Sequence, residues 1–213
     1  MRAGGLDAAL LGPEAWDEAG APPLTRSQDA REPDLLRLAR NGDARAFQAL
    51  VDRHRPRVEA VAWRLTRDPR LADEVAQDAF VRMHTALPSF REDAAIATWL
   101  YRIVVNLCHD HARRVARDRS FPIDEAPPLP SHDDLPDASA EAAERTRVID
   151  SLVQSLPAPM REAVVLRYAG GLAYDEIAAT LGCPPGTVAS RIHRALRVIG
   201  LMLETRGIRE DSL

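Results

Sequence analysis

The chain has 213 residues, of which 46% are hydrophobic and 28% are charged, and its formal net charge is −4. This length suffices for one domain or two small ones, and no apolar run approaches the roughly 20 residues of a membrane-spanning helix. Acids interrupt the short apolar patch near the N-terminus, so no secretory signal is expected and the chain is predicted to be cytoplasmic. The two cysteines are too few and too distant in sequence for a disulfide framework or a paired-thiol metal site.

The negative charge is concentrated in one stretch of the chain. Residues 118–144 carry eight acids and one base, so the remaining residues have a net charge of +3. All 28 lysine or arginine positions are arginine. Arginine suits phosphate and base-edge contacts better than lysine does, although a GC-rich coding bias would produce the same composition. The overall charge therefore does not exclude a nucleic-acid partner.

Composition and periodicity divide the chain into five segments and predict an all-α protein with two small helical domains. No stretch alternates with the period of a strand for long enough to indicate a sheet. The expected segments are a disordered N-terminal extension (1–32), a first helical domain (33–117), a flexible, acidic, proline-rich linker (118–140), a second helical domain (141–207) and a tail (208–213).

The first helical segment contains signals for the beginnings of its helices. Three aspartates are placed as N-caps of successive helices, namely Asp34, Asp43 and Asp68. Pro56 falls within the second of these helices and is expected to kink it. The last helix of the segment, over 96–117, is predicted to bury a stripe made of Trp99, Leu100, Ile103, Val104 and Leu107.

Two polar clusters lie on outward faces of these helices. The acidic cluster is Asp73, Glu74, Gln77 and Asp78, and the basic cluster is Arg113, Arg114 and Arg117. By default the acidic cluster is only a solvated helix face. The basic cluster, by itself, is more typical of a helix end that complements the helix dipole than of a nucleic-acid site.

The stretch "LGCPPGTVASRIHRALRVIG" at residues 181–200 has the form of a helix-turn-helix, in which a proline-glycine break separates a short helix from a second one over 186–199. The inward stripe of the second helix is Val188, Ile192, Ala195, Leu196 and Ile199, and its outward residues are Thr187, Ser190, Arg191, Arg194 and Arg197. A solvated face would normally mix acids with bases, but no acid occurs between Glu176 and Glu204. The pattern favours contact with DNA, with the helix start at base edges and its body on phosphates.

The sequence contains no constellation that indicates catalysis, a metal or a cofactor. His109 and His111 lie beside Cys108 at helical spacings that prevent the three side chains from converging on one ion. A phosphate loop, a nucleophile elbow and a set of nucleophile, base and orienting residue are missing as well. The protein is therefore expected not to be an enzyme.

Two long runs resemble the extracytoplasmic-function (ECF) sigma factors of the sigma-70 family. The run "SFREDAAIATWLYRIVVNLCHDHARR" is similar to region 2 of that family, and "LPAPMREAVVLRYAGGLAYDEIAATLGCPPGTVASRIHRAL" is similar to region 4. Both are joined by a variable linker, so the resemblance covers about residues 33–203. The phrase "WLYRIVVNLCHD" is also similar to the actinobacterial SigM-like branch.

The resemblance implies a region 2 helical bundle and a region 4 helix-turn-helix of the winged-helix-like or homeodomain-like three-to-four-helix type. Binding to core polymerase is implied for Asp73, Glu74, Gln77 and Asp78. Contact with the minus-10 element is implied for Ser89, Phe90, Arg91, Asn106, Asp110, Arg113, Arg114 and Arg117, and contact with the minus-35 element for Thr187, Ser190, Arg191, Arg194 and Arg197. The family's usual "GTVKSR" is "GTVASR" here, so Ala189 stands in place of a basic contact.

The implied function is promoter-specific, stress- or signal-responsive transcription initiation together with bacterial core RNA polymerase, through the β′ clamp helices and the β subunit. An anti-sigma factor is expected as a further partner and as a route to membrane tethering, and the holoenzyme would be nucleoid-associated. Two alternatives remain open at this point. One is a stand-alone helix-turn-helix transcriptional regulator, in which residues 33–117 sense a signal or dimerise, and the other is an interaction module that sequesters partners without DNA.

Overall fold

The computed structural model describes residues 32–90, 95–118 and 140–206, and all regular elements within these ranges are helical. They are α3 (Glu32–Arg40), α4 (Ala44–Thr66), α5 (Pro69–Ala86), the 3-10 turn η2 (Leu87–Ser89), α6 (Ile96–Asp118), α7 (Ala140–Gln154), α8 (Ala158–Tyr168), α9 (Tyr174–Leu181) and α10 (Pro185–Thr205). The all-α prediction is thereby confirmed for this part of the chain. The predicted N-terminal extension, acidic linker and tail lie outside the described residues.

Two of the three predicted N-caps are confirmed. The Asp43 carboxylate accepts hydrogen bonds from two backbone N–H groups in the first turn of α4, at 2.9 and 3.0 Å. Asp68 caps α5 in the same way, at 2.9 and 3.2 Å. The prediction for Asp34 is wrong, because α3 begins at Glu32 and Asp34 lies in its first turn. Pro56 lies within α4, which continues to Thr66, and the kink expected there stays a prediction.

Helices α3 to α6 form the N-terminal bundle. Helix α4 packs against α3, α5 and α6, and the chain reverses between α4 and α5 at Arg67, whose φ of 57° is left-handed. The core between these helices contains fully buried apolar side chains from three of them, among them Leu50, Val58, Met83, Leu100 and Val104. Burial of this apolar surface is what holds the bundle together.

Helices α7 to α10 form the C-terminal bundle. Its core includes Leu152, Val164, Ile177, Val188 and Ile199, all of them buried. Helix α10 extends to Thr205, six residues beyond the predicted end at 199, because Leu203 continues the buried stripe one turn further. None of the helices within the described ranges is long and apolar enough to span a bilayer.

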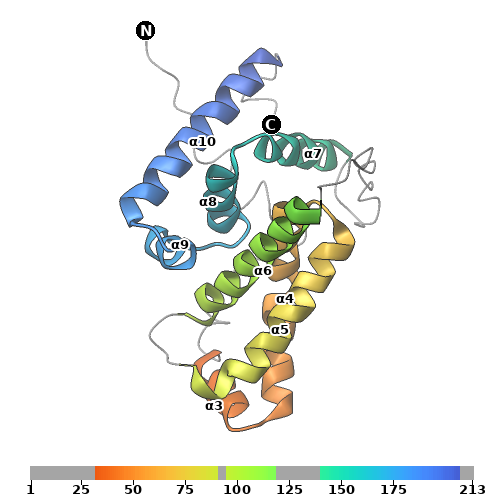
Figure 1. The fold of residues 1–213 in the computed structure, drawn as a ribbon, viewed down its shortest axis with the longest axis vertical. Coiled ribbons are helices and arrows are strands. Elements are labelled where there is room, and N and C mark those ends of the chain that lie inside the picture. The colour runs from red at the N-terminus through yellow and green to blue at the C-terminus, as the bar shows by residue number, and fades with distance from the viewer. Residues whose placement is uncertain (1–31, 91–94, 119–139, 207–213) are drawn as a thin grey trace.

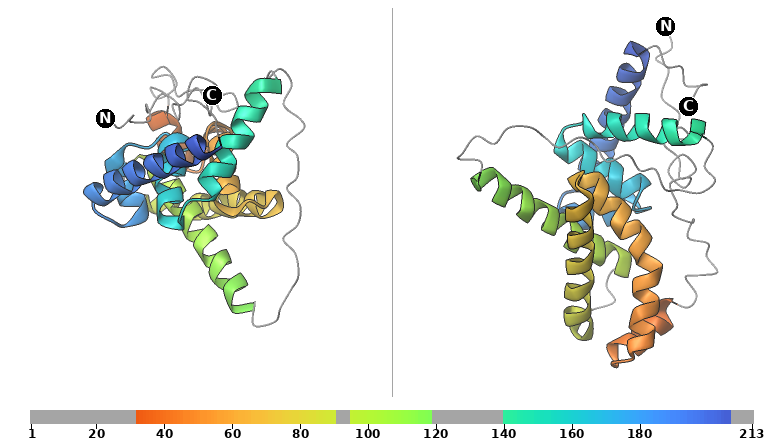
Figure 2. Two further views of the ribbon diagram at one scale, coloured as in Figure 1. Left: turned by 90° about the horizontal axis from the view of Figure 1, so that it is seen from above. Right: turned by 90° about the vertical axis from the view of Figure 1, so that its right-hand side faces the viewer.

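Helix α6 is the helix of the N-terminal bundle that faces α9 of the C-terminal bundle (Figures 1 and 2), and it packs against α4 and α5 on another side. Of the predicted apolar stripe, Leu100, Val104 and Leu107 are buried, whereas Trp99 and Ile103 are half-buried. The helix also buries Thr98, Tyr101, Val105 and Cys108. Thr98 faces the C-terminal bundle, since its hydroxyl donates a hydrogen bond to Glu176 of α9 at 3.1 Å. The sequence did not reveal this second buried side of α6.

The N-cap of α5 provides a test of the fold. We expect Asp68→Ala to lower the free energy of unfolding by about 1 kcal/mol, because two N–H groups of the first turn lose their acceptor. Urea unfolding followed by far-UV circular dichroism measures the change. Asp68→Asn is the control, since asparagine caps helices about as well as aspartate. A loss in Asp68→Asn as large as in Asp68→Ala would contradict the capping role.

Candidate nucleic-acid interface

A tight turn joins α9 to α10. Gly182 ends α9 with a left-handed φ of 62°, which glycine adopts without strain. The Cys183 N–H then bonds to the carbonyl of Ala178 at 3.1 Å. Pro184 and Pro185 follow as N-cap and first helical residue, where a missing N–H costs nothing. The "GCPPG" break is therefore a rigid helix-turn-helix corner, as the sequence predicted.

Helix α10 has an inward and an outward face. Four residues of the predicted inward stripe are buried, namely Val188, Ile192, Ala195 and Ile199, while Leu196 is half-buried. Of the five predicted outward residues, Ser190, Arg194 and Arg197 are exposed, and Thr187 and Arg191 are half-buried. The structure thus places three arginines and two hydroxyl side chains on one side of a helix whose other side is fixed in a core.

Local contacts orient the polar side chains at the start of α10. The Ser190 hydroxyl donates to the carbonyl of Thr187 at 2.9 Å, and Arg191 Nη1 contacts Cys183 Sγ at 3.8 Å. Further along, Arg197 Nη2 lies 3.4 Å from His193 Nε2. Because thiols are weak acceptors, Arg191 can exchange this contact for a stronger one with an acceptor on DNA.

The exposed side of α6 carries the second group of predicted DNA contacts. Asn106, Arg113, Arg114 and Arg117 are exposed, and Asp110 is half-buried. Arg113 forms an ion pair with Asp110, and its hydrogen bond lowers the pKa of the Asp110 carboxyl. Arg117 Nε donates to the carbonyl of Arg113 at 3.3 Å. Between Asn106 and Arg117, α6 therefore presents three exposed guanidinium groups and the half-buried carboxylate of Asp110.

The turn after α5 packs against α6. Phe90 is buried, and its ring centroid lies 4.9 Å from that of Trp99 on α6. In this arrangement the Phe90 ring packs the turn against α6, and its contact with DNA stays a prediction. Ser89 is exposed, with its hydroxyl donating to the carbonyl of Ala86 at 2.9 Å. Arg91 lies outside the described residues.

The acidic cluster lies on the outer side of α5. Asp73, Glu74, Gln77 and Asp78 are all exposed, and Gln77 Nε2 donates to Asp73 Oδ2 at 2.7 Å. One turn further, Val81 is 64% exposed, the most exposed of the large apolar side chains in the described ranges. Sequence reasoning missed Val81, although its spacing of four residues from Gln77 places it on the same face.

The residues that the structure describes hold no group of three or more His, Cys, Asp or Glu side chains that could bind a metal ion. Cys108 is a free, buried thiol, and burial raises its pKa to about 12. The thiolate, which is the reactive form, is therefore scarce at neutral pH. Cys183 is half-buried in the helix-turn-helix corner.

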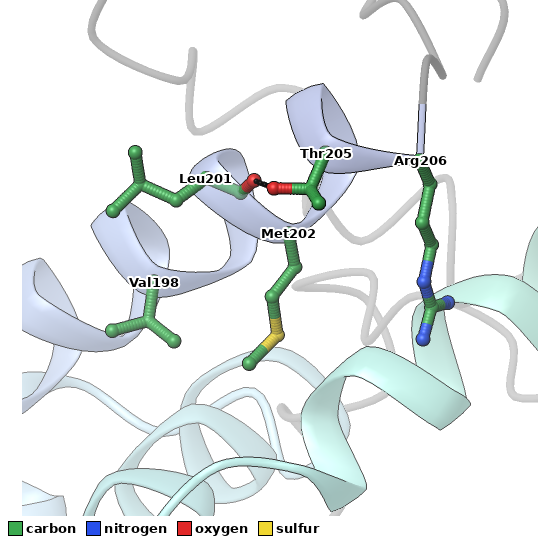
Figure 3. A pocket seen from close by; sticks show the side chains of 5 residues that line it. All are labelled: Val198, Leu201, Met202, Thr205 and Arg206. Atoms are coloured by element: carbon green, nitrogen blue, oxygen red, sulfur yellow. Dashed lines mark hydrogen bonds between the residues drawn. The ribbon is translucent and has the colours of Figure 1, made fainter.

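An open groove of about 310 Å³ lies beside the last turns of α10 (Figure 3). It is lined by Val198, Leu201, Met202, Thr205 and Arg206. The Thr205 hydroxyl donates to the carbonyl of Leu201 at 2.7 Å, so the hydroxyl is engaged within the helix. Apolar side chains with one arginine do not supply a nucleophile paired with a base.

Comparison with known proteins gives matches in both bundles. The family described as "Sigma-70 region 2" matches residues 50–118, and the family described as "Sigma-70, region 4" matches residues 146–199. The RNA polymerase sigma-H factor of Pseudomonas aeruginosa is 36% identical over 193 residues, covering 85% of this chain and 96% of that protein. The ECF RNA polymerase sigma-E factor of Escherichia coli is 34% identical over 183 residues, covering 81% and 94%.

Two solved structures are similar to this one. A structure of CnrH in complex with the cytosolic domain of CnrY has a TM-score of 0.60 and 29% identity, covering 80% of this chain and 96% of that chain. The sigma factor RpoE from Bartonella quintana, in complex with the anti-sigma factor NepR, has a TM-score of 0.56 and 25% identity, covering 70% and 91%. Both alignments are longer than either bundle alone.

Proposed function

The chain belongs to the ECF sigma factors of the sigma-70 family, and we propose that it performs promoter-specific initiation with three surfaces, one each for the minus-35 element, the minus-10 element and core RNA polymerase. The observation that carries the proposal is the outer face of α10 from Thr187 to Arg197, which contains no acid and follows directly after the corner at Gly182 and Pro185. The two domains would correspond to residues 33–117 and 141–207. The SigM-like branch stays a prediction.

The outer face of α10 would read the minus-35 element in the major groove of duplex DNA. In a helix-turn-helix the N-terminal residues of the second helix meet base edges, whereas residues further along contact the backbone. Thr187, Ser190 and Arg191 would accordingly contact bases, and Arg194 and Arg197 would contact phosphates. Ala189 lies among the base-contacting residues without a polar group, so discrimination would depend more strongly on Arg191.

The exposed side of α6 would hold the opened minus-10 element. Single-stranded DNA binds where cations follow the backbone and polar groups reach unstacked bases. Arg113, Arg114 and Arg117 supply the cations, and Asn106 and Asp110 supply polar groups on the same helix. Phe90 would contribute indirectly by packing the adjoining turn against α6. Ser89 and Arg91 would contact the single-stranded DNA beside this turn.

The outer face of α5 would dock onto the clamp helices of the polymerase β′ subunit. Asp73, Glu74, Gln77 and Asp78 form its polar part, and Val81 adds an exposed apolar contact at one end. Protein interfaces combine polar and apolar contacts in this way. The β subunit, promoter DNA and an anti-sigma factor would be the other partners. The last is supported by the related sigma factor RpoE from Bartonella quintana, whose structure was solved in complex with the anti-sigma factor NepR.

The proposed factor is cytoplasmic, binds no cofactor and catalyses no reaction itself, since polymerase makes the RNA. Run-off transcription with purified core enzyme tests the function. We expect transcripts that depend on both the factor and a promoter. A stand-alone regulator would instead bind duplex DNA tightly by itself and give no promoter-dependent transcript with core enzyme, and that pair of results would overturn the proposal.

Replacing single arginines of α10 tests which of them contact bases and which contact phosphates. We expect Arg191→Ala to weaken binding of the preferred minus-35 sequence by about 1 to 3 kcal/mol, because a contact with a base edge is lost. Arg197→Ala should weaken binding to all promoter sequences alike and reduce the slope of the logarithm of the binding constant against the logarithm of the salt concentration by about 1. Holoenzyme binding to promoter variants at several salt concentrations measures both effects. A uniform loss in Arg191→Ala would identify a phosphate contact instead.

Charge reversal on α5 tests the polymerase surface. We expect Asp73→Lys combined with Glu74→Lys to weaken binding to core enzyme at least about tenfold, since like charges across an interface cost several kcal/mol. Both side chains are exposed, so far-UV circular dichroism should be unchanged. The same reversal at Asp34, exposed on α3, is the control. Normal holoenzyme assembly by the double variant would refute this placement.

A further inference from the structure

The contact between the two bundles holds most of the buried polar side chains among the described residues. The described residues include five buried polar or charged side chains, and four of them meet between the bundles, namely Arg64, Thr98, Asp150 and Thr180. The fifth, His54, lies within the N-terminal bundle, 3.4 Å from Glu32. Buried apolar side chains run through both bundles as one cluster, so the few buried polar side chains are concentrated where the bundles meet.

An ion triad lies at one end of this interface, where α4 meets α7. Arg64 Nε is 3.3 Å from Asp150 Oδ1, and Arg67 Nη1 is 3.6 Å from Asp150 Oδ2, so each carboxylate oxygen faces one guanidinium. The Arg64 and Asp150 side chains are only 6% and 9% exposed. Arg67 also lies 4.1 Å from the ring centroid of Trp63, and Gln154 Nε2 donates to the backbone carbonyl of Arg64 at 2.6 Å.

Polar contacts continue along α6 toward α8 and α9. Thr98 donates to Glu176, and Thr180 donates to the backbone carbonyl of Thr98 at 3.5 Å. His109 Nε2 lies 2.7 Å from Glu162 Oε1 on α8. Cys108, next to His109, is buried close enough to Glu162 for that carboxylate to help raise its pKa.

This chemistry suits an interface that opens. A buried ion pair contributes little net free energy, because desolvation offsets the Coulomb attraction, but loss of one partner leaves a buried charge and is costly. When the bundles separate, water can hydrate every one of these polar groups. The contact between the bundles therefore requires all three charged residues of the triad, but it can still open because each of them can be hydrated.

The closed arrangement keeps the two proposed DNA readers close together. Helix α9 packs against both α6 and α10, so the axes of the two reader helices lie roughly 20 Å apart there, at 8 to 10 Å per packed pair. Because α9 meets α6 at Thr98, Arg113 lies about 22 Å further along α6, and this still leaves the readers much closer than the promoter elements are. The minus-10 and minus-35 elements lie about 25 base pairs apart, or about 85 Å along B-DNA. A fully extended chain of the 21 residues between Asp118 and Ala140 measures about 70 Å. The width of the two separated domains can supply the rest of the distance between the promoter elements.

We propose that Arg64, Arg67 and Asp150 form a latch that holds the two bundles in a closed state unable to read both promoter elements, and that core polymerase binds the open state. The part that concerns polymerase and promoter rests on the proposed function. The latch itself requires only that the two bundles separate in solution.

The native cysteines report on opening. In the closed state Cys108 is buried beside α8, whereas Cys183 lies in the α9–α10 corner away from the latch. Alkylation with iodoacetamide, quantified for each cysteine by peptide mass spectrometry, follows the population of the open state when closing is fast. We expect Asp150→Asn to accelerate alkylation of Cys108 about tenfold or more, with Cys183 changed less than about twofold.

Asp34→Asn is the matched control, since it removes the same charge from an exposed pair with Arg37 and should leave both rates unchanged. Thr98→Val removes a hydrogen bond at the other end of the interface and should also increase the rate of Cys108 alkylation. If Asp150→Asn loses helicity in circular dichroism, the rate of Cys108 alkylation in Thr98→Val becomes the deciding measurement. The latch is overturned if the Cys108 rate is unchanged in a folded Asp150→Asn protein, or, where that variant is misfolded, if it is unchanged in Thr98→Val.

Affinity for core enzyme tests the coupling. If only the open state binds, the apparent affinity of Asp150→Asn should rise by up to the factor by which its open population rises. Faster Cys108 alkylation with unchanged core affinity would overturn the coupling to polymerase. Absence of transcription with the wild-type protein would overturn the proposed function instead, and would leave the alkylation result intact.

Discussion

Helix α6 is the element on which the rest of the structure depends, because it must satisfy three different environments along one helix. One side packs into the N-terminal core through Leu100 and Val104. A second side meets α9 through Thr98. The third side carries Asn106 and the terminal arginines in solvent. A residue added or removed in this helix would rotate all three sides out of register, since successive residues are about 100° apart.

The corner between α9 and α10 shows how backbone chemistry positions function. A left-handed glycine ends one helix, and a proline pair starts the next at an angle that the backbone cannot easily change. The buried stripe of α10 then fixes the rotation of that helix. The outward arginines are long and adaptable, but the helix that carries them is rigid. Specific recognition needs this combination, because ordering the reader before binding reduces the entropic cost of binding.

Local signals and periodicity were sufficient to predict most of each bundle, but not the contact between them. The N-caps Asp43 and Asp68, the corner at Gly182 and the stripe of α10 involve neighbours within one or two turns, so the sequence reveals them directly. The pair of Arg64 and Asp150 joins residues 86 positions apart, and nothing in either local pattern predicts the partner. The packing of Phe90 against Trp99 was not predicted for a related reason, because it depends on how a turn folds back onto α6.

The division of charge along the chain also has a structural counterpart. Arginines that face solvent on α6 and α10 have few acids nearby, whereas the arginines that face a carboxylate between the bundles are among the least exposed. The same residue type therefore serves two purposes. An exposed guanidinium remains hydrated and can exchange water for phosphate at little cost, while a buried one is committed to its carboxylate for as long as the bundles stay together. A chain whose basic residues are all arginine can thus be acidic overall and still contain separate basic surfaces for DNA and a charged contact between its two halves.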